Sequence, residues 1–258
     1  TSFYRRALDA ALAGDGFGHV EADLDRLAAG FSRGFTRGFL GGASGEDEPE
    51  LAGAFFLGPP LPVGERLYVL AEIEQEIRLC SLRAATGRML WSRVVARPEA
   101  AILDDPARRL AGASPAWAEG VVVCPTSAGA VVAVDPATRT VLWGHEYPVV
   151  EQSARVRKLR MAGVRVPGSE ARGSTSVDAV PTIAGRYVLL APVESPELLC
   201  LDLRSGELVW KVQPDDLLYI GGAVGDTVLV VGEQELSAWH LRSGKPAWIS
   251  VRFSRLPA

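Results

Sequence analysis

The stretch Leu199-Cys-Leu-Asp202-Leu-Arg-Ser205-Gly206-Glu-Leu-Val-Trp210 is one of four copies of a single pattern. Each copy ends on a tryptophan: Trp91, Trp143, Trp210 or Trp248. A Ser or Thr stands five residues before it, a small residue stands ten before it, and glycine stands four before it in three copies. The second copy has Arg139 at the glycine position. Such internal repetition indicates one structural unit copied along the chain.

Each copy has the features of a β-hairpin, because apolar residues run up to a turn cluster and resume after it. Asp135 and Asp202 can accept hydrogen bonds from turn N–H groups, and the following glycine can adopt positive φ. If the second hairpin keeps this turn, Arg139 has positive φ and is strained. A further pair of apolar runs precedes each hairpin, which predicts four strands per unit. These upstream parts are Pro62 to Leu70, Pro115 to Val123, Pro181 to Leu190 and Gly222 to Val231.

Several predicted strands are apolar without alternation, for example 187–191 and 227–231. Strands of this kind are covered on both faces. Four-stranded antiparallel sheets stacked around an axis satisfy that condition, because each sheet is covered by its neighbours. The predicted fold class is therefore all-β, a β-propeller of about four blades, whose tryptophans dock between blades.

The pattern Leu-x-Ala-Leu-Asp-x-x-Thr-Gly-x-x-x-Trp, from about Gly58 to Trp248, resembles the PQQ-like (quinoprotein-like) propeller repeat family. The resemblance implies a ring of seven or eight blades, so that four blades leave two apolar end faces to be covered by remaining blades of the protein's own chain. It also implies a bacterial, periplasmic or cell-envelope protein. Fold does not fix function, and the family contains enzymes and non-enzymatic scaffolds.

Residues 1–50 do not fit the repeat and are predicted to form a helical N-terminal segment and linker, followed by the blades in 51–258. Apolar residues spaced three and four apart predict one helix over about 2–13 and another over about 20–31. The phenylalanines of Phe31-Ser-Arg-Gly-Phe35-Thr-Arg-Gly-Phe39 are four apart and are expected to pack on the propeller. Gly14 to Gly18 is not a dinucleotide loop, because no strand precedes it.

Two connections between blades carry insertions. The first is predicted to hold a short helix from Asp105 to Leu110, with the aspartate as its cap. The second, around 149–177, is a basic stretch in an acidic chain and contains the candidate partner-binding residues Arg155, Arg157, Lys158, Arg160 and Arg165. Two interpretations stay open for it, a contact for an anion or a protein partner and a solvated loop.

Composition limits the functional classes. The net charge of −4 and the pI near 5.5 argue against nucleic acid as a partner. No apolar run approaches the roughly 20 residues of a membrane-spanning helix, so no membrane insertion is expected within this segment. Three cysteines in separate predicted blades indicate buried free thiols, and three isolated histidines give no local zinc motif.

A quinoprotein dehydrogenase would need a PQQ and calcium site. The family pattern for that site includes adjacent cysteines, a tryptophan floor, and Glu, Asn and Asp residues around calcium. The chain has no adjacent cysteines and no asparagine, so PQQ and calcium are not expected as cofactors. The sequence favours a non-enzymatic scaffold or binding module that presents loops to a protein partner or ligand. The alternative is part of a PQQ-dependent dehydrogenase whose cofactor residues lie outside this chain.

Overall fold

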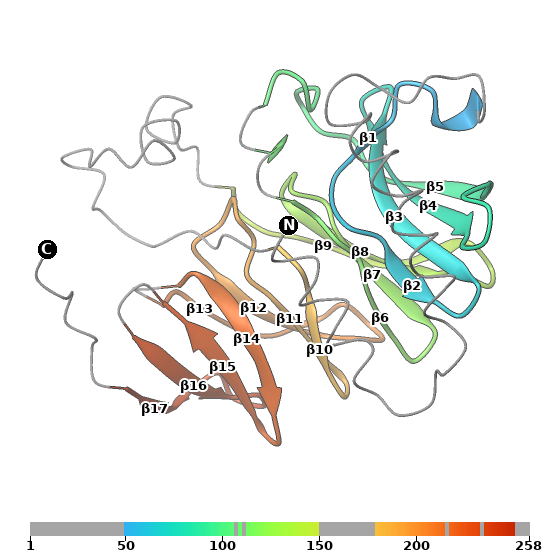
Figure 1. Ribbon diagram of the computed structural model, residues 1–258. Helices are drawn as coiled ribbons and strands as arrows, with labels where there is room; N and C mark the ends of the chain where they lie inside the picture. The colour runs from blue at the N-terminus through green and yellow to red at the C-terminus, as the bar shows by residue number, and fades with distance from the viewer. Residues whose placement is uncertain are drawn as a thin grey trace, which may run out of the picture.

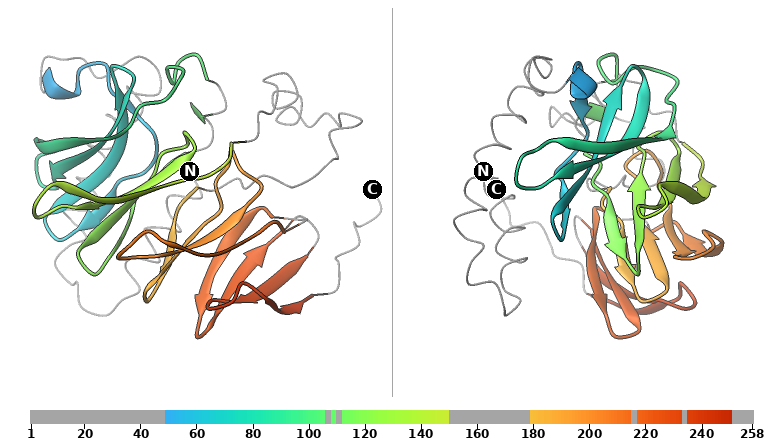
Figure 2. Two further views of the ribbon diagram at one scale, coloured as in Figure 1. Left: turned by 180° about the vertical axis from the view of Figure 1, so that it is seen from behind. Right: turned by 90° about the vertical axis from the view of Figure 1, so that its right-hand side faces the viewer.

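The computed structural model describes residues 49–105, 108–109, 112–149, 179–214, 217–232 and 235–250. Within them the chain forms four antiparallel sheets, which follow one another side by side like the blades of a fan (Figures 1 and 2). The expected propeller fold with four-stranded blades is confirmed. Residues 1–48 of the predicted N-terminal segment (1–50) and residues 150–177 of the predicted insertion (149–177) lie outside the described residues. The two N-terminal helices and the five basic candidates therefore stay predictions. In the described part of the chain, no helix is long and apolar enough to cross a membrane.

The four blades are numbered in chain order, and a short 3-10 helix, η1 (Pro49–Leu51), precedes them. Blade 1 contains β1 (Phe55–Phe56), β2 (Leu61–Val63), β3 (Arg66–Ile73), β4 (Glu76–Arg83) and β5 (Met89–Ala96), with both β1 and β2 paired to β3. Blade 2 contains β6 (Ala116–Ala118), β7 (Val121–Pro125), β8 (Ala130–Asp135) and β9 (Thr140–Glu146). Blade 3 contains β10 (Thr182–Ala184), β11 (Tyr187–Leu190), β12 (Leu198–Asp202) and β13 (Leu208–Val212). Blade 4 contains β14 (Tyr219–Val224), β15 (Thr227–Val231), β16 (Leu236–His240) and β17 (Pro246–Ile249).

The last hairpin of every blade has the same irregularity, a register shift directly after the small residue of the repeat. That small residue lies opposite the repeat tryptophan on the neighbouring strand, as in the pairs Cys200↔Trp210 and Ala238↔Trp248. Cross-strand neighbours on one face are close enough for their side chains to touch. A large side chain opposite the indole would therefore compete with it for space. This pairing explains why the position ten residues before the tryptophan is small in every copy.

Apolar clusters fill the three junctions between neighbouring blades. Between blades 2 and 3, for example, Val123 and Val131 pack with Leu190 and Leu199, all essentially without solvent contact. Both faces of the middle blades are therefore buried, as the unbroken apolar runs predict.

The two end faces of the row differ. On blade 1, β3 and β4 bury Val69, Ala71 and Cys80 completely, and Leu51 and Ala54 belong to the same cluster. The prediction of an uncovered end face is therefore wrong for blade 1. Residues preceding the blade cover this sheet.

The fourth blade also departs from its predicted beginning. The upstream part of the fourth unit was predicted to begin at Gly222, whereas β14 begins at Tyr219 and holds Gly222 inside it at φ +124°. The register between β14 and β15 shifts between Ile220 and Gly222. Glycine inside a strand often marks such a bulge, so this glycine bends the strand and does not delimit it.

Candidate interaction surface

The tryptophans of blades 2 and 3 each contact the last turn of the following blade. Trp143 Nε1 donates a hydrogen bond to the carbonyl oxygen of Leu203 at 2.9 Å. Trp210 Nε1 donates to the carbonyl oxygen of Leu241 at 2.6 Å. Both indoles are at least nine-tenths buried. The accepting carbonyl stands three residues before the repeat glycine in both turns, so the contact repeats with the sequence.

The repeat glycine allows this contact because the indole lies directly over it. A Cβ added to Gly206 would lie 2.5 Å from the ring of Trp143, and a Cβ added to Gly244 would lie 2.5 Å from the ring of Trp210. Real Cβ atoms essentially never come so close to another heavy atom. We call the segment from the accepting carbonyl to this glycine the acceptor turn.

The acceptor turn of blade 3 is held in shape by Asp202. Its Oδ1 accepts hydrogen bonds from the backbone N–H groups of Arg204 and Ser205, at 2.9 and 3.1 Å. Its Oδ2 accepts from Arg186 Nε at 3.0 Å. The hydrogen bond from Arg186 lowers the pKa of Asp202, and the two backbone N–H groups act in the same direction. The predicted turn role of this aspartate is confirmed.

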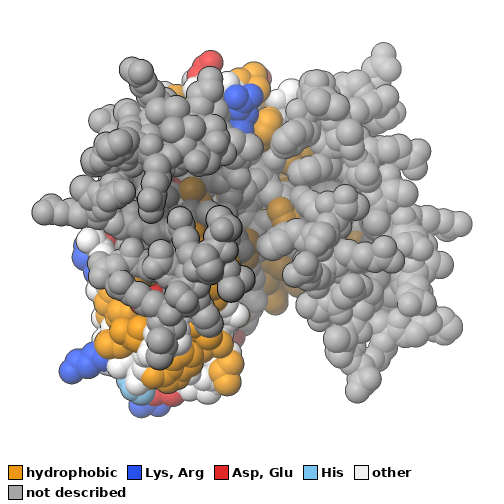
Figure 3. Space-filling view, turned by 60° about the vertical axis from the view of Figure 1, so that its left-hand side comes forward, with side chains coloured by type: hydrophobic (Ala, Val, Ile, Leu, Met, Phe, Trp, Pro, Cys, Tyr) orange, Lys and Arg blue, Asp and Glu red, His pale blue; other side chains and the backbone are white. Residues whose placement is uncertain are grey.

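Blade 4 carries the same tryptophan, but in the described residues no blade follows it. Trp248 is 46% exposed, and every residue of β17 is exposed. Tyr219, Val224 and Ile249 add further exposed apolar surface on this blade. Hydrophobic side chains gather at the lower left of the space-filling view, on the side of this last blade (Figure 3). The prediction of an uncovered apolar end face is therefore confirmed for blade 4, and Trp248 differs from the other repeat tryptophans in not being docked against a following blade of the described residues.

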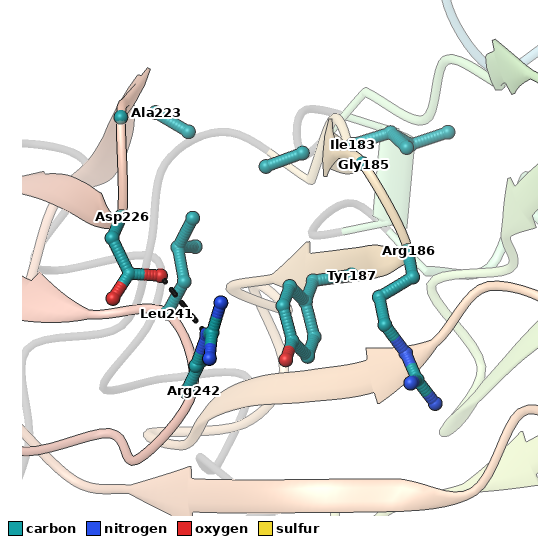
Figure 4. Close-up of a pocket in the computed structure, with 10 residues that line it drawn as sticks. Ile183, Gly185, Arg186, Tyr187, Ala223, Asp226, Leu241 and Arg242 are labelled. Carbon is teal, nitrogen blue, oxygen red and sulfur yellow. Dashed lines mark ion pairs between the residues drawn. The ribbon is translucent and has the colours of Figure 1, made fainter.

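A cavity of about 700 Å³ lies between blades 3 and 4. Its walls come from the first turns of both blades and the acceptor turn of blade 4 (Figure 4). Arg242 lies between Asp226 and Tyr187, and its Nε is 3.6 Å from Asp226 Oδ1. Arg186 extends away from Arg242, toward Asp202. Both arginine side chains are largely exposed, so the charged side of the cavity is open to solvent.

The family model described as outer membrane protein assembly factor BamB matches residues 50–250. The chain belongs to this family. Among curated proteins none matches the sequence.

Several solved structures are similar to this BamB-like chain. BamB from Moraxella catarrhalis is 15% identical, with 74% of this chain and 47% of that chain covered and a TM-score of 0.47. A europium-containing methanol dehydrogenase is 15% identical, with 76% and 42% covered and a TM-score of 0.45. Sqt1 from Saccharomyces cerevisiae is 11% identical, with 74% and 46% covered and a TM-score of 0.45. The chain spans about half the length of these proteins.

The cysteines of the BamB-like chain lie in the described residues, so their surroundings can be compared with the family pattern for a PQQ and calcium site. Its three cysteines are free and buried in three different blades, and none is adjacent to another. Burial raises the pKa of the Cys80 and Cys200 thiols to about 12 and raises that of Cys124 as well. Across the described ranges, no three His, Cys, Asp or Glu residues lie close enough to hold a metal ion.

The first insertion is described only in part. Asp105 Oδ1 accepts a hydrogen bond from the backbone N–H of Arg108 at 3.1 Å, which confirms its predicted capping role. Sequence reasoning did not identify the ion pair that anchors this insertion. Arg108 Nη2 contacts Glu72 Oε2 at 2.5 Å, and both side chains are buried. The pattern of the repeat gives no signal for it, because Glu72 lies in a strand and Arg108 in a connection.

Proposed function

We propose that this chain is a non-enzymatic β-propeller scaffold that binds protein partners. The observation that carries the proposal is the open face of blade 4, where Trp248 is 46% exposed while its three equivalents are 7 to 9% exposed. Large exposed apolar patches on a protein surface mark interaction sites. Aromatic residues are enriched in the centres of such interfaces.

The geometry of the filled junctions defines what fits this face. A partner needs an apolar sheet face and a turn in which a residue without Cβ lies beneath the indole of Trp248, as Gly206 and Gly244 lie beneath theirs. A further blade of the same repeat has these features. The remaining blades of a seven- or eight-bladed ring are therefore the first proposed partner. The BamB family description, an assembly factor, is consistent with protein binding as the task of the completed ring.

A second contact is proposed for the basic insertion, whose residues Arg157, Lys158 and Arg160 stand out in a chain of net charge −4. If this stretch binds a partner, replacing these three residues with serine weakens association in a salt-dependent way and leaves folding intact. Binding that is unaffected by the three substitutions at low salt would assign the stretch to a solvated loop.

The test of the scaffold proposal is quantitative capture from an extract of the cells that produce the protein. The immobilised wild-type chain is compared with Trp248→Arg and with Leu103→Arg, a matched control in which a 69% exposed leucine outside blade 4 receives the same charge. Proteins that bind through the open face are lost with Trp248→Arg and kept with Leu103→Arg. Equal capture by all three chains would contradict a role for this face.

A second arm of the experiment tests the dehydrogenase alternative. The chain is titrated with PQQ in the presence of calcium, and bound quinone is followed by its absorbance. We expect no saturable binding, because the described residues do not provide the donor set. Saturable binding with dye-linked alcohol oxidation would overturn the non-enzymatic proposal. We also propose a periplasmic or cell-envelope location, which fractionation of the producing cells would test.

A further inference from the structure

The three junctions between blades are not equivalent. At the junction of blades 1 and 2, Trp91 is 7% exposed, yet its Nε1 has no hydrogen-bond partner among the described residues. Ser81, which lies opposite Trp91 on the neighbouring strand, is fully buried, and its Oγ also has no partner there. A buried donor without a partner loses its hydrogen bonds to water and gains none in return. This junction therefore contains two unsatisfied donors where the junctions formed by Trp143 and Trp210 have a hydrogen bond.

The cause lies in the acceptor turn of blade 2. Arg139 has the position of Gly206 and Gly244 and the same backbone conformation, with φ +61°. A Cβ at that position in the other blades would lie 2.5 Å from the indole, so the Cβ of Arg139 excludes Trp91 from the equivalent place. The ring of Trp91 lies instead 6.0 Å from that of Tyr68, measured between centroids.

The same turn lacks a second contact. In blades 3 and 4 the residue three before the glycine donates its N–H to the first turn of its own blade, from Leu203 to Arg186 O at 2.8 Å and from Leu241 to Asp226 O at 2.9 Å. Blade 2 has Pro136 at this position, and proline has no N–H. Arg139 and Pro136, where blades 3 and 4 have glycine and leucine, thus leave the acceptor turn of blade 2 without the two hydrogen bonds that hold the acceptor turns of blades 3 and 4 in place.

We propose that the junction of blades 1 and 2 is the point at which the row of blades opens. Apolar packing remains there, with Tyr68 of blade 1 stacked on Trp117 of blade 2 and a backbone hydrogen bond from Ala113 N–H to Leu57 O at 2.9 Å. What is missing is the hydrogen bond from the repeat tryptophan to the acceptor turn, which the other two junctions have. Proteins open locally in cooperative units, and the least stabilised interface opens first. Opening here separates blade 1 from blades 2 to 4, while the junctions formed by Trp143 and Trp210 stay closed.

The native cysteines make the proposal testable, because two of them report on different junctions. Cys124 belongs to the apolar cluster between blades 1 and 2, and Cys200 to the cluster between blades 3 and 4. Both have no exposed surface in the closed state. A thiol reagent therefore reaches each of them only when its own junction, or the whole chain, opens.

The experiment labels the full chain with a thiol reagent under native conditions and follows each cysteine by mass spectrometry at low conversion. Each rate is divided by the rate of the same cysteine in denaturant. We expect Cys124 to react at least about tenfold faster than Cys200, which corresponds to ~1.4 kcal/mol in the free energy of opening. Equal rates, or faster reaction of Cys200, would overturn the proposal, because the junction of blades 1 and 2 would then not open first.

Two matched variants separate this local opening from a general loss of stability. Arg139→Gly removes the obstructing Cβ and should slow the labelling of Cys124, leaving that of Cys200 unchanged. Gly244→Arg places the same obstruction in the junction of blades 3 and 4 and should speed the labelling of Cys200 alone. A parallel change at both cysteines in Arg139→Gly would contradict the proposal even if Gly244→Arg does not fold.

Discussion

The contact between Trp143 and the acceptor turn of blade 3 can be measured by adding a single methyl group. Gly206→Ala places a Cβ 2.5 Å from the indole at a residue with φ +72°. The indole must move away, and Trp143 Nε1 then loses its hydrogen bond to the carbonyl of Leu203. Gly87→Ala is the matched control, because Gly87 has φ +71° in the equivalent turn of blade 1 and a Cβ there has no described atom within 4 Å.

The two variants share the cost of the backbone conformation and differ in the indole contact. A Cβ in the left-handed region costs about 1–2 kcal/mol, of which roughly 0.4–1 kcal/mol is offset because alanine makes the unfolded chain stiffer. Leaving a buried N–H without a partner costs about 1–3 kcal/mol more. We therefore expect Gly87→Ala to lower the free energy of unfolding by about 1 kcal/mol and Gly206→Ala by about 2–4 kcal/mol.

Urea denaturation followed by circular dichroism gives both values, provided that the m-values agree with that of the wild type. The informative quantity is the difference between the two variants, since the conformational cost cancels in it. A difference below about 0.5 kcal/mol would refute the assignment of this glycine to the tryptophan contact.

Three further predictions follow from the same structure. Trp210→Ala should lower the free energy of unfolding by roughly 3–5 kcal/mol, whereas Trp248→Ala should lower it by less than about 1 kcal/mol. A decrease below about 1 kcal/mol for Trp210→Ala would contradict the role of Trp210 in packing between blades. Arg139→Gly should raise the free energy of unfolding by a few tenths to about 1 kcal/mol, and a clear destabilisation in the same assay would show that the Cβ is not a source of strain. Burial lowers the pKa of His145, so as the pH falls the imidazole is protonated in the unfolded chain before it is protonated in the folded chain. The free energy of unfolding should therefore be unaffected by His145 above about pH 6.5 and should decrease below it. His145→Gln should make the unfolding midpoints between about pH 7 and 5.5 less dependent on pH.

The fold could be predicted from the sequence because the pattern of one unit occurs four times along the chain. The hairpins, their turn aspartates and the burial on both faces follow from short-range features such as apolar runs and the spacing of Asp, Gly and Trp. The end faces could not be predicted in the same way. Whether Val69 and Cys80 are covered depends on residues such as Leu51 and Ala54, which lie outside the repeat and carry no periodic signal.

The candidate surface was predicted less well than the fold. The basic residues proposed from charge contrast lie outside the described residues, whereas the face around Trp248 is the apolar end face expected of a row of four blades. That face is apolar, so no charge pattern marks it, and its repeat tryptophan has the same sequence context as Trp210. The difference between a buried and an exposed copy depends on whether another blade follows in space. A single repeat does not encode that neighbour.

Arg139 shows which property of glycine the repeat requires. From the sequence, the repeat glycine was predicted to serve through its freedom at positive φ, and the glycines of blades 3 and 4 do have φ of +72° and +62°. Arg139 nevertheless keeps φ at +61° in the same turn, so a side chain is compatible with this backbone conformation at a modest strain. What Arg139 does not keep is the contact with the indole, since Trp91 Nε1 is left without a partner in the described part of the chain. The missing Cβ, more than the backbone conformation, therefore explains why glycine recurs beneath Trp143 and Trp210.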